Sequence, residues 1–126
     1  MHTTPDTQSS VIVKSIIQDN ARSYYSGYIF VGENALNSES DQQSSALLFN
    51  DARAHAIPAL EILTNDVQCK HGSAIGYINP DQLFYMQSRG LLLEQAELLI
   101  KNGFLRLPPA QHPEFSSYNF FDKTPE

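Results

Sequence analysis

Short runs of β-branched and aromatic residues, separated by polar turns, dominate residues 11–78 and predict a mainly β fold. No Asn-Gly or Asp-Gly pair marks a tight hairpin between these runs. Short strands without hairpin turns are compatible with a parallel coil, in which each turn stacks on the previous one, although a sandwich fits the same pattern. No exact internal repeat is visible. The expected strands are residues 11–17, 22–31, 46–49, 59–63 and 74–78.

A helical pattern replaces the strand pattern after residue 78. Asn79 is suited to cap a helix, Pro80 fits the first helical position, and Gly90 is a typical stop, so a helix is expected at residues 80–88. Apolar residues recur at helical spacing in residues 93–102, which predicts a second helix that ends near Gly103.

The segments after Asn102 and before the first strand lack regular patterns. Residues 105–126 contain four prolines and are expected to form an irregular tail. Residues 1–10 are polar and are expected to form a loop. The predicted organisation is therefore a β core at residues 1–78, a helical segment at 79–104 and the tail.

Charge and cysteine content restrict the classes of partner and compartment. The formal net charge is −6 and the eight Lys and Arg residues are scattered, which disfavours nucleic acid and anionic membrane surfaces as partners. A single cysteine, Cys69, cannot form an internal disulfide and fits a reducing compartment. No apolar run reaches the roughly 20 residues that span a bilayer. We expect a cytoplasmic protein without membrane insertion.

The most informative segment is residues 66–90, which read DVQCKHGSAIGYINPDQLFYMQSRG. A Cys-x-His-Gly element comes first, a small and β-branched run follows, and a Phe-Tyr helix closes the segment with Ser-Arg-Gly. This order resembles the signature of the SufB/SufD family of iron–sulfur cluster assembly proteins, with a SufD-like pattern. The resemblance continues to the Asn-Gly-Phe ending at residue 104 and covers most of residues 2–104.

The resemblance implies a right-handed parallel β-helix followed by a short two-helix segment. It also implies a scaffold component that binds SufB-like proteins and the ATPase SufC, and that is not itself an enzyme. Family members are several hundred residues long, so the chain is expected to be a fragment or a reduced homologue. A β-helix cut in mid-coil exposes a sheet end, which suits pairing with a second copy as a homodimer.

Cys69 and His71 form the candidate metal site. Two residues apart on a strand, their side chains point to the same face. A thiolate and an imidazole are suitable ligands for iron, but two ligands do not complete a four-coordinate site. The resemblance implies that the remaining ligands come from a SufB-like chain, with a transient iron–sulfur cluster or iron at the interface and no cofactor in the isolated chain. The alternative is structural: a small buried cysteine and a hydrogen-bonded histidine.

The helical segment supplies the candidate partner surface. Tyr85 and Arg89 are spaced i and i+4, so they share one helix face that is expected to bind a SufC-like protein. A competing expectation is that Leu83 and Phe84 pack this helix on the β core. The remaining candidate partner-binding residues are Glu94, Glu97 and Lys101 on the second helix.

A second function class fits the same residues. A small β-helical or cupin-like metal-binding enzyme would use Cys69, His71 and a third ligand such as His55 or Glu61. Against an enzyme, the chain has no G-x-S-x-G element, no P-loop and no paired carboxylates at a telling spacing. We therefore expect a scaffold and assign no catalytic residue.

Overall fold

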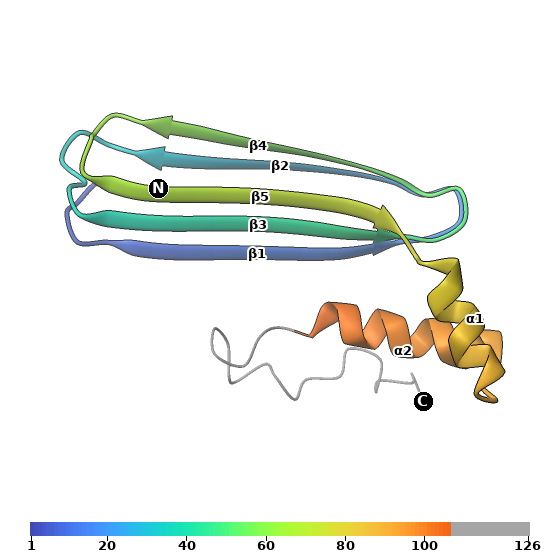
Figure 1. The fold of residues 1–126 in the computed structure, drawn as a ribbon. Coiled ribbons are helices and arrows are strands. Elements are labelled where there is room, and N and C mark those ends of the chain that lie inside the picture. Colours follow the sequence, from blue (N-terminus) through green and yellow to red (C-terminus); the bar gives the residue numbers. More distant parts are fainter. Residues whose placement is uncertain (107–126) are drawn as a thin grey trace, which may run out of the picture. The chain divides into compact units, whose positions relative to one another are not determined.

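The computed structural model describes residues 1–106, which form five strands and two helices (Figure 1). The chain alternates between two parallel sheets, one with the strand order β1-β3-β5 and the other with β2-β4. The strands are β1 (Gln8–Ile17), β2 (Arg22–Val31), β3 (Ser38–Leu48), β4 (Arg53–Ile62) and β5 (Val67–Tyr77). The predicted mainly β fold with C-terminal helices is confirmed. Residues Met1–Gly76 form one compact unit and a second begins at Tyr77.

A regular register relates the strands within each sheet. β1 pairs with β3 from Gln8 and Glu39 onward, and β2 pairs with β4 from Arg22 and Arg53 onward. Both pairings join residues that lie 31 positions apart, as in the contact between Ser9 and Ser40. The chain therefore has a conformational repeat, although its sequence shows none.

Stacked turns with aspartate and asparagine support this register. Asp6, Asp19, Asn37 and Asn50 all have a positive φ, between 54° and 59°, and these short polar side chains tolerate that conformation better than most residues. The Asn37 amide donates to the Asp6 carboxylate at 2.6 Å, and the Asn50 amide donates to the Asp19 carboxylate at 3.0 Å. Each turn thus lies directly beside the equivalent turn of the next coil.

Four of the five expected strand starts are wrong, since β4 also begins at Arg53 and not at residue 59. β3 begins at Ser38 and not at residue 46, β5 begins at Val67 and not at residue 74, and β1 begins at Gln8 inside the predicted loop. For β3 the cause is a polar interior. Four buried side chains of β3 alternate with exposed or half-buried ones, which is the period of a strand, although serine and glutamine are residues more typical of turns and loops. These buried side chains are Ser38, Ser40, Gln42 and Ser44.

Two small apolar clusters complete the interior of the β unit. One contains Ile17, Leu48 and Ala52. The other is built from the buried residues Ile29, Val31 and Ala35, against which three further side chains pack: Leu60, Val67 and Cys69. In the second cluster, inner side chains of β5 contact residues of the other sheet and of the turn that follows β2.

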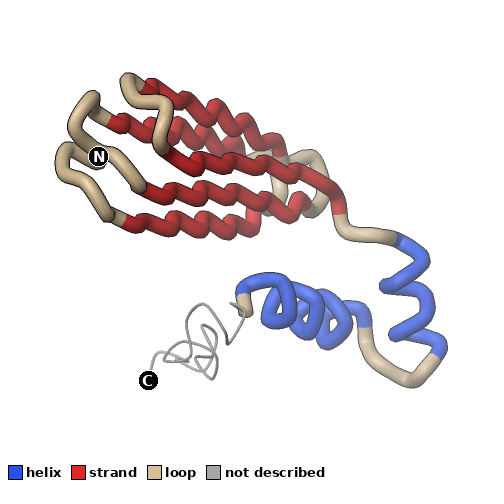
Figure 2. The backbone as a smooth tube through the Cα atoms, turned by 60° about the vertical axis from the view of Figure 1, so that its left-hand side comes forward, coloured by secondary structure: helices blue, strands red, loops and turns tan. Residues whose placement is uncertain are grey.

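The helical unit contains α1 (Pro80–Ser88) and α2 (Leu93–Leu105), which contact one another (Figure 2). The Asn79 side chain accepts from the Asp81 N–H at 2.9 Å, and Gly90 has a φ of 98°, which confirms the expected start and stop of α1.

The predicted end of the second helix is wrong. Gly103 lies inside α2, because the helix continues through Leu105 and its C-cap is Arg106 with extended backbone. Glycine ends a helix through a positive φ, and among the described residues Gly90 is the glycine that has one. Residues 107–126 lie outside the described residues, so the expected tail stays a prediction beyond Arg106.

Candidate functional site

The inner side of β5 carries the two candidate ligands. The Ser44 hydroxyl of β3 donates to the Ser73 hydroxyl of β5 at 3.2 Å, so Ser73 faces the interior beside Ser44. Counting back four residues on both strands brings Cys69 to the level of Ser40. His71 lies between Cys69 and Ser73 on the same face. We call this face, with Cys69, His71, Ser73 and Ile75, the open face of β5.

The two candidate ligands differ in exposure. Cys69 is half-buried and packs against the cluster of Ile29, Val31 and Ala35, whereas His71 is exposed. The difference follows from the topology, because the sheet opposite β5 has only two strands among the described residues. Burial raises the pKa of the Cys69 thiol above its ordinary value. The thiol is therefore held more strongly in its protonated form than a free cysteine.

That pKa shift predicts slow alkylation of Cys69. The thiolate is the reactive form, so a raised pKa lowers its fraction at pH 8 and makes the folded chain react several-fold more slowly with iodoacetamide than the urea-unfolded chain. The rate in the folded chain should keep rising above pH 9. Mass spectrometry of the single cysteine measures both rates. Equal rates at pH 8 in the folded and unfolded chains would contradict the prediction.

A buried hydroxyl network lies beside this face. His2 is 4% exposed, and its two ring nitrogens lie 2.6 Å from the Thr7 hydroxyl and 2.7 Å from the Ser9 hydroxyl. Ser9 continues to Ser40 at 3.0 Å, and Thr7 continues to Ser38 at 2.8 Å. The sequence pattern around His2 did not predict this burial. Both ring nitrogens have hydroxyl partners, so burial of this polar ring is compensated.

A second polar contact crosses from one sheet to the other. The Gln42 amide of β3 donates to the Tyr25 hydroxyl of β2 at 2.8 Å. This amide occupies the place beside Gly27 where any other residue would have its Cβ. Gly27 is therefore required by the close approach of the Gln42 side chain.

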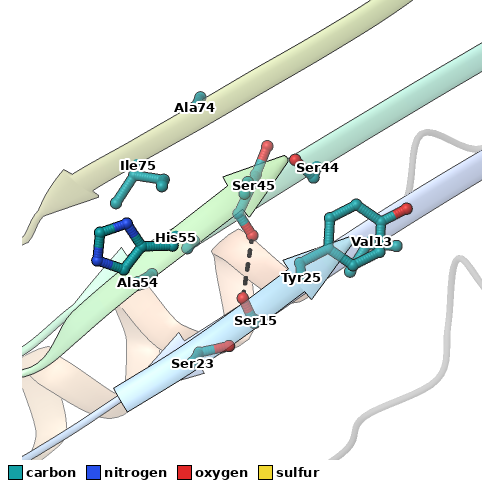
Figure 3. A pocket seen from close by; sticks show the side chains of 12 residues that line it. Val13, Ser15, Ser23, Tyr25, Ser44, Ser45, Ala54, His55, Ala74 and Ile75 are labelled. Carbon is teal, nitrogen blue, oxygen red and sulfur yellow. Dashed lines mark hydrogen bonds between the residues drawn. The ribbon is translucent and has the colours of Figure 1, made fainter. Parts of the chain in front are cut away.

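A small pocket between the sheets is lined mainly by small side chains (Figure 3). Serine and alanine dominate the lining, and the Ser15 hydroxyl donates to the Ser45 carbonyl at 3.5 Å. The pocket does not include Cys69 or His71. The residues that line it include Val13, Ser15, Ser23, Tyr25, Ser44, Ala54 and Ile75.

The third-ligand candidates lie on the outer side of the other sheet. His55 stacks on Tyr24 with ring centroids 4.9 Å apart, and Glu61 accepts from the Tyr28 hydroxyl, which raises the pKa of that tyrosine. Within residues 1–106, no three His, Cys, Asp or Glu side chains lie close enough together to hold a metal ion. The structure thus does not group His55 or Glu61 with Cys69.

The helices expose most of the predicted partner residues. Tyr85 is 63% exposed, and Arg89 and Glu94 are also exposed. Glu97 and Lys101 are half-buried and pair with each other at 3.4 Å. Phe84 is 73% exposed, and the expectation that Leu83 and Phe84 pack this helix on the β core stays a prediction.

Several leucines in α2 and at its N-cap are exposed, which the sequence pattern did not predict. Leu92, Leu93, Leu98 and Leu99 all have exposed side chains, whereas Ala96 of α2 is fully buried. Helical spacing alone places Leu99 with Ala96 on the apolar face, and it does not tell which side is covered. No helix among the described residues is both long and apolar enough to span a membrane.

Comparison with protein families gives the class of protein. Residues 1–104 match the family model described as "SUF system FeS cluster assembly, SufBD core domain". The chain therefore belongs to the SufBD core family of the SUF iron–sulfur cluster assembly system.

Three individual relatives show how much of each protein the similarity covers. The chain is 34% identical over 92 residues to the iron–sulfur cluster assembly protein SufD of Escherichia coli K12, an overlap of 72% of this chain and 22% of that protein. It is 29% identical over 106 residues to a SufBD family protein of Staphylococcus saprophyticus, covering 83% of this chain and 23% of the relative. A Mycobacterium tuberculosis SufBD family protein is 31% identical over 106 residues, an overlap that covers 83% of this chain and 12% of the relative. The chain spans less than a quarter of the length of these relatives.

Proposed function

We propose that the chain is a SufD-like scaffold component of iron–sulfur cluster assembly, which acts through SufB-like and SufC-like partners and has no catalytic activity of its own. Family membership supports the pathway. In this proposal the two parallel sheets are a segment of a right-handed parallel β-helix, and the protein is cytoplasmic. The iron–sulfur cluster is then cargo that is held between chains.

The observation that carries the proposal is the open face of β5. Cys69 and His71 lie on one side of β5, the third strand of its sheet, whereas the opposite sheet has only two strands among the described residues. A thiolate and an imidazole suit iron, and a second chain that covers this face would supply the missing ligands. Cys69 must lose a proton to bind, and its raised pKa opposes this step until a cation or partner arrives.

The exposed side chains of α1 and α2 form the second part of the proposal. We define the helical partner surface as Phe84, Tyr85, Leu98 and Leu99, with Arg89 and Glu94 as exposed charges beside these apolar side chains in the sequence. Large exposed apolar side chains rimmed by charge are typical of protein–protein contacts. In this proposal they bind the SufC-like ATPase.

Anaerobic reconstitution with a SufB-like partner, iron and sulfide tests the role of His71. We expect His71→Ala to lower iron retention in the complex by about tenfold or more, because even loss of a group that only supports a ligand costs about 10–100-fold in metal affinity. His55→Ala is the matched control, since His55 is also exposed but lies on the outer side of β4. Equal loss in both variants, or no loss in either, would contradict the assignment of His71.

A further inference from the structure

The outer face of the β2–β4 sheet is rich in exposed aromatic and apolar side chains. Tyr24 is 76% exposed, Tyr28 is 60% exposed and Ile57 is 57% exposed. The two strands lie side by side (Figure 1), and the register places five rows of two side chains on this face. Exposed patches of this kind mark interaction sites. The rows are Arg22 with Arg53, Tyr24 with His55, Ser26 with Ile57, Tyr28 with Ala59, and Phe30 with Glu61.

Opposite charges occupy the two ends of this face. Arg22 and Arg53 are in register at one end, and Glu61 lies at the other. Like charges on neighbouring strands repel each other, and among the described residues no carboxylate forms an ion pair with either arginine. The arginine pair is therefore a cationic end that lacks an anion, on a chain whose net charge is −6.

We propose that this outer face docks on the same face of a second copy of the chain. The two-fold axis runs across the strands, so the strands of the two copies are antiparallel. This arrangement places Arg53 opposite Glu61 of the second copy, and by symmetry the pair occurs twice. Tyr24 then lies opposite Tyr28, and Ile57 meets its own equivalent on the axis.

Side-chain size and charge favour this arrangement over the other two-fold symmetric arrangement, in which the axis runs along the strands. His55 meets the small Ala59, and the Arg22 guanidinium lies over the Phe30 ring, which is a favourable cation–π geometry. If the axis ran along the strands instead, each row would face itself and Arg53 would lie opposite Arg22 of the second copy. The antiparallel pairing converts that repulsion into attraction.

The size of the face sets the strength of the contact. Two strands of ten residues cover on the order of 300–400 Å², from a rise of about 3.3 Å per residue and a strand spacing of about 4.8 Å. Stable complexes bury about 800 Å² per partner. We therefore expect a weak, concentration-dependent dimer. None of the residues of this face belongs to the open face of β5 or to the helical partner surface, so the dimer is proposed independently of the scaffold role.

Sedimentation velocity of the full chain over a concentration series from about 10 to 500 µM tests the dimer, with dissociation constants in that range expected. Arg53→Glu and Glu61→Arg should each shift the equilibrium at least tenfold toward monomer. The double variant Arg53→Glu/Glu61→Arg should restore the dimer, because the pair is re-formed with its charges exchanged. Lys70→Glu and Glu39→Arg make the same charge changes on other strands and should leave the equilibrium unchanged.

Three results would overturn the proposal. The first is a monomer at every concentration, which would leave the face to a different acidic partner or to none. The second is a dimer that neither single variant weakens, which would place the contact elsewhere, for instance at the edge of β5. The third is a double variant that stays monomeric, which would exclude the antiparallel arrangement.

Discussion

Replacing Gly27 with alanine is expected to lower the free energy of unfolding by about 2–3 kcal/mol, the upper part of the range for overpacking a filled interior. An alanine Cβ at this position would overlap the Gln42 side-chain amide, which is buried and donates to the Tyr25 hydroxyl at 2.8 Å. Either the amide moves and loses its partner, or the two sheets move apart. Both outcomes cost stability, because a buried amide without a partner is unfavourable.

Urea unfolding followed by circular dichroism measures this effect. Gly76→Ala is the matched control, because a Cβ at Gly76 meets nothing within 4 Å. The double variant Gly27→Ala/Gln42→Ala should recover part of the loss, since it removes the atoms that the new Cβ would overlap. A Gly27→Ala variant as stable as Gly76→Ala would contradict the packing described for the interior.

Changing Leu98 to aspartate is expected to weaken binding of a SufC-like ATPase about 30-fold, which corresponds to the roughly 2 kcal/mol of an interface hot spot. The Leu98 side chain is 46% exposed in α2, so a charge there should leave the isolated chain folded while it opposes an apolar contact. The same argument applies to Phe84→Asp in α1. This prediction rests on the proposed role of the helical partner surface.

Isothermal titration calorimetry with the purified ATPase compares these variants with the parent chain. Leu36→Asp is the control, because Leu36 is 49% exposed but lies between β2 and β3, away from both helices in the sequence. Unchanged affinity for both helix variants would remove the helical partner surface from the account, while equal loss in Leu36→Asp would show a general effect of added charge.

Much of the fold could be predicted from local sequence signals. β2 is marked by a run of aromatic and β-branched residues, and α1 by cap residues at its two ends. These signals depend only on residues nearby in the sequence, so both elements were predicted with the bounds that the structure has. β3 could not be predicted in this way. Its inner side chains are serines and a glutamine, which form hydrogen bonds with residues of other strands. A hydrophobicity pattern does not detect hydrogen-bond partners that are distant in the sequence.

The same limit applies to the candidate site. The two-residue spacing of Cys69 and His71 was enough to place them on one side of a strand. It did not reveal that Cys69 is half-buried and His71 exposed, because that difference depends on strands of the opposite sheet. The role of His2 was also hidden, since its hydroxyl partners are five or more residues away along the chain.

The central claim is that this chain acts by binding partners in iron–sulfur cluster assembly. Size-exclusion chromatography with light scattering, on the chain mixed anaerobically with a SufB-like and a SufC-like protein, tests it most directly. We expect a complex that contains all three chains and that retains iron and sulfide less well when His71 is alanine. Three separately eluting proteins, with cluster formation on the SufB-like chain unchanged by this one, would contradict it.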